Sequence, residues 1–168
     1  INISSPNTPN LRVLQNSEEL DHLLSTLKSE QIKLTNEYGK YTPLVVKIAP
    51  DLNSTQVISI ATLLIKHKID GVIATNSTLS RSEVENLPNS EETGGLSGSP
   101  LTKISTNIIR QLHAVLKGTV PIIGVGGIMC ASDAQEKIDA GASLIQIYTG
   151  LIYQGPELVR DAVKIFCK

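Results

Sequence analysis

The sequence predicts an α/β fold in which parallel strands form the core. Four short segments, at residues 44–49, 71–75, 121–125 and 143–148, are rich in Ile and Val and almost continuously apolar. Strands of a parallel sheet have this composition because both of their faces are covered. Amphipathic segments separate the four runs, so the chain repeats a β-α unit with right-handed crossovers. We expect one domain over residues 1–168.

Three helices are predicted to begin at a capping pair, in which a polar N-cap residue is followed three positions later by Glu or Gln. The pairs are Asn16 with Glu19, Asn53 with Gln56, and Ser132 with Gln135. A further helix over residues 104–116 carries a stripe of Ile and Leu and is expected to stop at Gly118, a typical C′ residue. Pro156 suits the first turn of a last helix.

The order of these elements fits either an open doubly wound sheet or part of a (β/α)8 barrel. No GxGxxG motif follows a first strand, which weakens the dinucleotide-binding version. Polar or glycine residues stand at the carboxyl end of every strand, where barrel enzymes carry their catalytic groups. They are Lys47, Thr75, Asn76, Gly126, Gly127, Tyr148 and Thr149. Four strands and the end of an earlier one make about half a barrel, so we expect the first half to be missing from this sequence.

The composition argues against several classes of protein. A formal net charge of −1 offers no basic surface for nucleic acid and no polybasic membrane signal. No apolar run is long enough to span a bilayer, so this stretch is expected to be soluble. Cys130 and Cys167 lie far apart and outside any CxxC pattern, so neither a metal site nor a disulfide is expected.

The segment Asn2–Arg12 combines amide and hydroxyl side chains with Pro6 and Pro9. Proline restricts its own backbone and that of the preceding residue, so the segment is a stiff polar loop. Such a loop can hold a small polar ligand, or it can be an ordinary turn that leads into a helix.

Glycines end the last two predicted strands, in Gly124–Gly127 and in Tyr148–Gly150. Loops after the last two strands of a barrel are a common phosphate site, although strand-end glycines can also serve only as tight turns. Lys47 is a charged residue inside an apolar run, so it is expected to meet an anion or line a site, unless it reaches solvent. No Ser-His-Asp grouping is visible, which favours a site where a cofactor performs the chemistry.

Taken together, the motifs along the chain resemble those of the dihydroorotate dehydrogenase family. The matching segments are Asn2–Pro9, Val46–Leu52, Asp70–Asn76, Glu92–Gly98, Ile122–Gly127 and Gly141–Thr149. They cover essentially the whole chain in the family's order. The resemblance implies the C-terminal half of a (β/α)8 TIM barrel that binds FMN. It also implies oxidation of dihydroorotate to orotate in pyrimidine biosynthesis.

The resemblance extends to a subclass, because the catalytic base is Cys in the soluble class 1 enzymes and Ser in the membrane-associated, quinone-reducing class 2. This chain has Ser5 at the matching position. The resemblance therefore implies that Ser5 removes the C5 proton of dihydroorotate, that Thr8 belongs to the proton relay, and that hydride passes from C6 to the flavin. It also implies quinone as the final acceptor. Peripheral attachment to the cytoplasmic side of a bacterial inner membrane would use N-terminal helices that this sequence lacks.

The family's ligand-binding positions carry over residue by residue. The pyrimidine-binding positions match Asn2, Asn7, Asn76 and Ser77, where the usual motif has Thr in place of Ser77. The flavin ring positions match Lys47, Thr75 and again Asn2, and the phosphate-end positions match Gly98, Gly127, Tyr148 and Thr149. No metal ligand is implied.

Two other functions stay open from the sequence. One is another FMN barrel that acts on pyrimidines, against which Ser5 in place of Cys argues. The other is a non-catalytic half-barrel that only binds phosphate or flavin. As a member of the dihydroorotate dehydrogenase family, this sequence by itself is expected to be inactive, because half of the barrel is missing.

Overall fold

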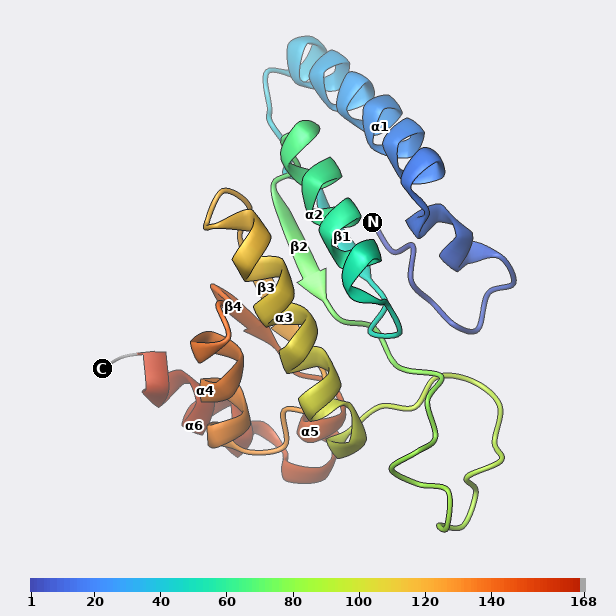
Figure 1. Ribbon diagram of the computed structural model, residues 1–168. Coiled ribbons are helices and arrows are strands. Elements are labelled where there is room, and N and C mark those ends of the chain that lie inside the picture. Colours follow the sequence, from blue (N-terminus) through green and yellow to red (C-terminus); the bar gives the residue numbers. More distant parts are fainter. Residues whose placement is uncertain (167–168) are drawn as a thin grey trace.

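The computed structural model describes residues 1–166, in which four parallel strands form one sheet (Figure 1). The strands are β1 (Val45–Ile48), β2 (Gly71–Ala74), β3 (Ile122–Val125) and β4 (Leu144–Gln146). They pair in chain order, β1-β2-β3-β4. A doubly wound sheet reverses its strand order part-way, whereas a barrel does not, so this unbroken order agrees with a barrel wall. The predicted α/β fold with a parallel sheet is confirmed.

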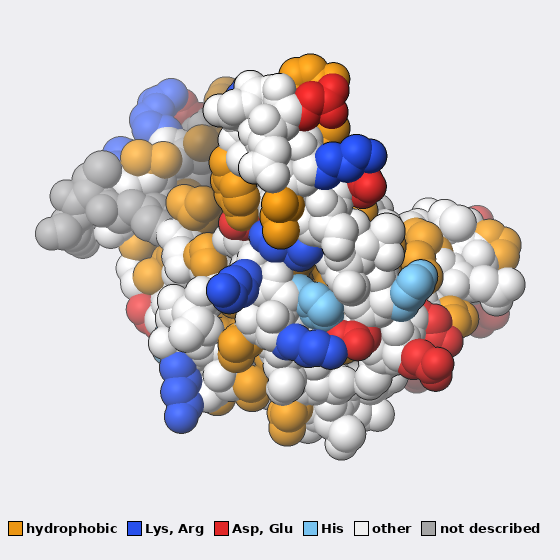
Figure 2. Space-filling model, turned by 90° about the horizontal axis from the view of Figure 1, so that it is seen from above, with side chains coloured by type: hydrophobic (Ala, Val, Ile, Leu, Met, Phe, Trp, Pro, Cys, Tyr) orange, Lys and Arg blue, Asp and Glu red, His pale blue; other side chains and the backbone are white. Residues whose placement is uncertain are grey.

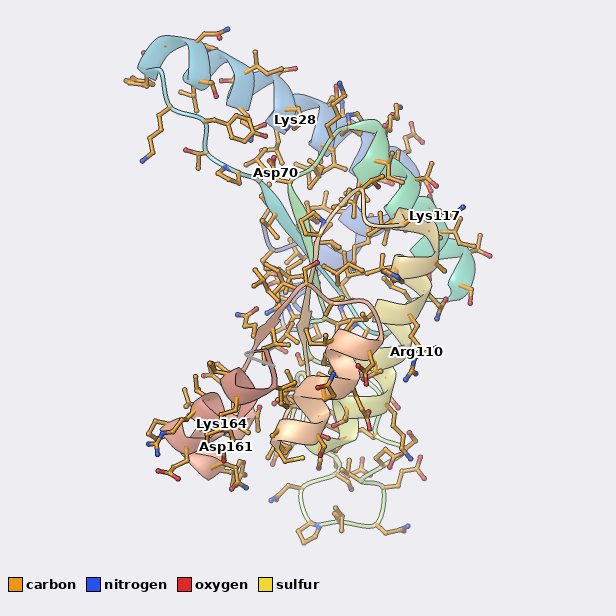
Figure 3. The ribbon with its side chains drawn as sticks, turned by 90° about the vertical axis from the view of Figure 1, so that its left-hand side faces the viewer. Lys28, Asp70, Arg110, Lys117, Asp161 and Lys164 are labelled. Atoms are coloured by element: carbon orange, nitrogen blue, oxygen red, sulfur yellow. The ribbon has the colours of Figure 1, made fainter. Side chains whose placement is uncertain are left out.

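Helices connect the strands and follow the last one. They are α1 (Ser17–Tyr38), α2 (Ser54–Lys66), α3 (Thr102–Leu116), α4 (Ala131–Asp139), α5 (Thr149–Gln154) and α6 (Pro156–Phe166), with 3-10 turns η1 (Leu11–Gln15) and η2 (Ser99–Leu101). The helices α2, α3 and α4 lie next to one another along one face of the sheet (Figures 1 and 3). The long segment between β2 and η2 projects away from the sheet (Figure 1).

The core lies between the sheet and the helices that cover this face. Val46 and Ile48 of β1 and Val72 of β2 are fully buried there, against Ile60 of α2 and Ile109 of α3. Each such side chain contributes about 1.5–3 kcal/mol on burial. The aliphatic core predicted from the composition is therefore present.

The opposite face of the sheet differs from the prediction, which had both faces covered. Lys47, Ile73, Ile123 and Leu144 stand opposite one another in the pairing register and so form one row on this face. The first three are half-buried, and Leu144 is 59% exposed. In a closed barrel such a row packs against the strands across the interior, and four strands supply only part of that interior.

Two of the three predicted capping pairs lie where a helix begins, at the N-termini of α1 and α2. Asn53 and Gln56 form the expected capping box, with each side chain accepting the other residue's backbone N–H at 2.9 Å. Helix α1 begins after Asn16, as expected, but the Asn16 side chain makes no capping bond. Asn16 also ends the preceding turn, where its backbone N–H donates to the carbonyl of Val13 at 2.9 Å.

The third predicted pair, Ser132 with Gln135, is wrong because α4 begins earlier, with Cys130 as its N-cap. The carboxylate of Asp133 accepts the backbone N–H groups of Met129 at 2.9 Å and Cys130 at 3.1 Å. A carboxylate satisfies these donors better than an amide, so it fixes the start of the helix. The short helix α5 was not predicted. Cys167 lies outside the described residues.

Asp70 fixes α1 at the end of the sheet where the strands begin (Figure 3). Its carboxylate accepts from the Leu44 N–H at 2.8 Å, the Tyr41 hydroxyl at 2.5 Å and the Gln31 amide at 3.2 Å, and Lys28 of α1 lies 3.9 Å away. Burial alone would raise the pKa of Asp70, but these hydrogen bonds and the Lys28 charge outweigh burial and lower it. Polar groups at this end of a barrel serve stability rather than catalysis.

The face seen in Figure 2 carries Lys and Arg side chains interspersed with Asp and Glu. An interspersed surface produces no field of one sign, as expected for a net charge of −1. Within residues 1–166, no helix combines the length and the apolar character that crossing a membrane requires.

Candidate active site

A pocket of about 300 Å³ lies at the carboxyl ends of the strands. Strands β1, β3 and β4 and the segment directly after β2 contribute to its lining. The lining residues are Lys47, Thr75–Ser77, Gly95, Ser97, Gly98, Leu101, Val125–Ile128 and Gln146–Gly150. Pockets of this size hold small organic ligands, and this edge of a barrel is where substrates bind.

The structure brings most of the predicted site residues to this pocket. Those that line it are Lys47, Thr75, Asn76, Ser77, Gly98, Gly127, Tyr148 and Thr149. The predicted residues of the first loop, Asn2, Ser5, Asn7 and Thr8, lie beside the lining rather than in it. Hydrogen bonds join three of them into one network with the pocket, whereas the side chain of Thr8 is exposed.

Asn76 joins the end of β2 to the first loop. Its side-chain nitrogen donates to Oδ1 of Asn2 at 3.2 Å and to Oγ of Ser4 at 3.1 Å. Its oxygen accepts the backbone N–H of Ser77 at 2.8 Å. The Ser4 hydroxyl, which is fully buried, donates to Asn2 at 2.9 Å. Sequence reasoning missed Ser4, although it stands beside Ser5 in the same motif.

Ser5 is half-buried, and its Oγ accepts the backbone N–H of Asn7 at 3.2 Å. Asn7 in turn accepts the N–H of Gly95 at 3.2 Å, so the loop before α3 closes over the first loop. The contact requires glycine, because a Cβ at Gly95 would lie 1.9 Å from Oγ of Ser77 and 2.8 Å from Pro6. Within residues 1–166, no His or carboxylate side chain bonds to Ser5.

Arg12 holds three of these segments together. Its Nε donates to the carbonyl of Ser4 at 3.1 Å, one terminal nitrogen to the carbonyl of Ser77 at 3.0 Å, and the other to Asp51 at 2.7 Å. Asp51 also accepts the Thr78 hydroxyl and the Leu79 N–H. Sequence reasoning gave neither Arg12 nor Asp51 a role at the site, because their pairing across 39 positions is visible only in the fold.

Lys47 lies at the end of β1 with its side chain half-buried in the pocket lining. Burial lowers the pKa of its ammonium group. Its backbone N–H donates to the carbonyl of Ile1 at 2.9 Å, so residues 1–3 run parallel to β1 and place Asn2 beside it. A cation and an amide therefore share this end of the pocket.

The glycine loop after β3 forms the other end of the pocket. Gly126 and Gly127 have positive φ angles of 116° and 72°. Their carbonyl oxygens point toward α3, where they accept from Ser105 at 2.9 Å and Thr102 at 2.6 Å. Because the C=O and N–H of a trans peptide point in opposite directions, the N–H groups of Gly127 and Ile128, two residues that line the pocket, are turned away from α3. Such amides suit an anion.

The loop before η2 completes this end. Ser97 Oγ and Thr149 Oγ1 lie 3.0 Å apart, and Gly98 packs against Thr149. Tyr148, which was predicted to contact the phosphate end, lines the pocket although its side chain is 76% exposed.

This geometry can be compared with known proteins. Residues 1–165 match the family model of dihydroorotate dehydrogenase. The chain belongs to the dihydroorotate dehydrogenase family. The resemblance seen in the sequence motifs is thereby confirmed.

Two curated relatives of this family are both named dihydroorotate dehydrogenase (quinone). The protein of Nitrosospira multiformis is 62% identical over 167 residues, which are 99% of this chain and 48% of the relative. The protein of Nitrosomonas europaea is 60% identical, over 99% of this chain and 49% of the relative. This chain thus spans about half the length of the curated relatives it matches.

A solved structure of DHODH from Eimeria tenella, in complex with ferulenol, superposes with a TM-score of 0.92. It is 38% identical in sequence, and the match covers 98% of this chain and 47% of that one. The ligand-free form from the same organism gives a TM-score of 0.90 at 40% identity. The predicted fold, half of a (β/α)8 TIM barrel of this family, is confirmed.

Proposed function

We propose that the protein containing this chain oxidises dihydroorotate to orotate, with FMN as hydride acceptor and quinone as final electron acceptor, in pyrimidine biosynthesis. The family supports a flavin in general, and FMN is our more specific proposal. The observation that carries the proposal is the pocket itself. It combines a group of amides and hydroxyls, a half-buried lysine and a glycine loop at one edge of the sheet.

The residues present fit a flavin mononucleotide. Lys47 and Thr75 line one end of the pocket and Asn2 lies beside Lys47, so polar groups can meet a flavin ring there. Gly98, Gly127, Tyr148 and Thr149 occupy the other end, where backbone N–H groups and a hydroxyl suit a phosphate. When bound, the flavin supplies the two-electron acceptor that the side chains of this site lack.

The amide and hydroxyl side chains suit the pyrimidine. Dihydroorotate presents ring N–H and C=O groups together with a carboxylate, so it needs both donors and acceptors. Asn2, Asn7, Asn76 and Ser77 can supply both kinds, because each amide carries a carbonyl oxygen and an NH₂ group. Asn76 bonds to Asn2 and to the Ser77 N–H. Asn7 accepts from the Gly95 N–H, so these amide side chains are held in place before substrate arrives.

Ser5 is proposed as the base that takes the proton from C5 while hydride leaves C6, so that a C5–C6 double bond forms. A serine hydroxyl is a weak base, and it needs help to accept a proton. The Asn7 N–H that donates to Oγ of Ser5 would stabilise negative charge on that oxygen. The exposed Thr8 is proposed to pass the proton onward to solvent.

Lys47 is proposed to stabilise the negative charge that develops when electrons reach the flavin ring. Its ammonium stands in a partly desolvated pocket, where a charge interaction is stronger than in water. This role requires the protonated form, whereas burial lowers the pKa of Lys47.

Quinone as acceptor is proposed from the names of the curated relatives, which specify it. We also propose peripheral attachment to the cytoplasmic side of the inner membrane, through a part of the protein outside this chain. No nucleic acid is proposed as a partner.

The proposal is tested by assaying orotate formation in the full-length protein. Dihydroorotate with a soluble quinone analogue is expected to give orotate, whereas NAD⁺ or fumarate in place of quinone should not. Dihydrouracil, which lacks the carboxylate, is the control substrate. Turnover of dihydrouracil in preference to dihydroorotate would favour another pyrimidine-oxidising barrel. Flavin binding without turnover of dihydroorotate or dihydrouracil would favour a protein that binds flavin without catalysis.

A further inference from the structure

Lys137 of α4 is the largest side chain in the structure that is fully buried, with none of its surface exposed. Its ammonium nitrogen donates to three oxygens in the first turns of α3. They are the Thr102 carbonyl at 2.7 Å, the Ser105 hydroxyl at 2.8 Å and the Thr106 hydroxyl at 2.5 Å. All three acceptors are neutral, so the direct partners of the buried charge carry no opposite charge.

Charged groups surround Lys137 without pairing with it. Asp133 and Glu136 of its own helix attract its charge from a distance, and Arg110, on the exposed side of α3 (Figure 3), repels it. Within residues 1–166, no carboxylate lies within 4.0 Å of its nitrogen. An ammonium that is buried without a counter-ion is costly, so an anion nearby would stabilise it.

The hydrogen-bond network leads from Lys137 to the glycine loop. A hydroxyl that accepts from the lysine must direct its own hydrogen elsewhere. The nearer of the two acceptors available to Ser105 is the carbonyl of Gly126, at 2.9 Å, and the carbonyl of Thr102 lies at 3.2 Å. Thr102, whose carbonyl also accepts from Lys137, donates its hydroxyl to the carbonyl of Gly127, at 2.6 Å. The lysine therefore stands behind the two peptides whose amides border the pocket.

We propose that Lys137 is a positioning residue for the phosphate end of the cofactor. It fixes the hydroxyl of Ser105 so that the glycine loop keeps its amides toward the pocket, and its positive charge attracts a phosphate bound to them. The inference rests on the proposed function, because it requires a phosphorylated flavin in this pocket. Lys137 is assigned no contact with the flavin.

The protonation of Lys137 agrees with this role. Burial lowers its pKa to about 8, so the free protein holds the proton weakly at neutral pH. A phosphate nearby would raise that pKa again, and by linkage the protonated lysine would favour the phosphate.

The test compares FMN with riboflavin, which has the same ring and no phosphate. The full-length protein is freed of flavin, and the dissociation constant of each flavin is measured by fluorescence quenching. Lys137→Met is expected to raise the dissociation constant of FMN about tenfold, a typical effect of removing a residue that orients a binding group. The dissociation constant of riboflavin should rise less than about twofold. The matched control is Lys103→Met, which removes an exposed lysine from the first turn of α3, next to Thr102. This variant should change neither dissociation constant.

Equal weakening of both flavins by Lys137→Met would assign the lysine a merely structural role and overturn the inference. Unchanged FMN binding would overturn it as well. If Lys137→Met fails to fold, Ser105→Ala keeps the lysine and removes its link to Gly126, and it should again weaken FMN more than riboflavin. The proposed function is tested separately, by FMN binding and orotate formation in the wild-type protein. The role of Lys137 and the proposed function can therefore be contradicted independently of each other.

Discussion

The first loop and the loop after β2 supply amide and hydroxyl side chains at and beside the pocket, whereas the glycine loop after β3 presents backbone groups. Asn76 bonds to Asn2 and Ser4 through side-chain atoms that a substitution removes. Gly126 and Gly127 act through peptides that any residue possesses, in a conformation that favours glycine. The first half of the pocket should therefore respond to changes in functional group, and the second half to changes in shape.

The residues that hold the two halves of the pocket in place also differ. Arg12 and Asp51 form an ion pair that is about one-quarter exposed and connects loops on the surface. Lys137 is fully buried and bonds to neutral oxygens. Solvent screens the first support and not the second. Loss of the first should mainly displace side chains, and loss of the second should mainly change the potential felt by an anion.

The largest effect is expected from Ser5→Ala, which removes the proposed base. Dihydroorotate oxidation should slow by about 10³-fold, within the range for general bases. FMN binding should be unchanged, because Ser5 lies outside the pocket lining. Ser5→Cys is the matched control, since a thiolate can replace the base, and it should retain part of the rate. A Ser5→Ala variant with normal turnover would remove Ser5 from the mechanism.

Gly127→Ala tests the shape of the second half. Gly127 has a φ of 72°, and a Cβ there would lie 2.2–2.5 Å from atoms of Thr102. We expect the free energy of unfolding to fall by at least about 2 kcal/mol, with weaker FMN binding. Gly118→Ala is the control, because its φ of 81° is also positive but nothing lies within 4 Å. It should cost only about 1 kcal/mol. Equal losses in urea unfolding would show that the close contact is unimportant.

Arg12→Met tests the support of the first half. It removes the hydrogen bonds to the carbonyls of Ser4 and Ser77 and the bond to the Asp51 carboxylate. Displacement of the first loop should slow dihydroorotate oxidation by about 10- to 100-fold without weakening FMN. Arg12→Lys keeps the charge opposite Asp51 but cannot form the same fork, so it should be intermediate. Wild-type kinetics in Arg12→Met would contradict this role.

The smallest effect concerns pH and Lys137. Burial lowers its pKa from 10.5 to about 8, so between these values the unfolded chain holds a proton that the folded protein has released. Raising the pH through this window therefore raises the free energy of unfolding. Relative to Lys137→Met, the flavin-free wild type should gain about 1–3 kcal/mol between about pH 7 and about pH 10 in urea unfolding. A constant difference between the two proteins would contradict the assignment.

The strands were predictable from the sequence because short apolar runs rich in Ile and Val are typical of buried strands. The site residues at their ends followed from topology, since the carboxyl ends of parallel strands converge. Lys47 is the clearest case, as a charge inside an apolar run that lines the pocket.

Other features depend on three-dimensional contacts that a sequence does not display. Lys137 lies among charged and polar residues in a short helix, a pattern that is typical of a solvent-exposed face. Its burial results from α4 packing over the first turns of α3. The start of α4 was misplaced because Asp133 and Ser132 are both plausible capping residues, and only the backbone geometry selects Asp133.

The most direct test of the two-part pocket is anaerobic flavin reduction by dihydroorotate, followed by loss of the flavin's visible absorbance in full-length variants saturated with FMN. The account predicts that Lys137→Met bleaches at nearly the wild-type rate once it is loaded, whereas Ser5→Ala holds FMN and bleaches about 10³-fold more slowly. Normal bleaching in Ser5→Ala together with failure of loaded Lys137→Met would contradict the division of the pocket into a chemical half and a phosphate half.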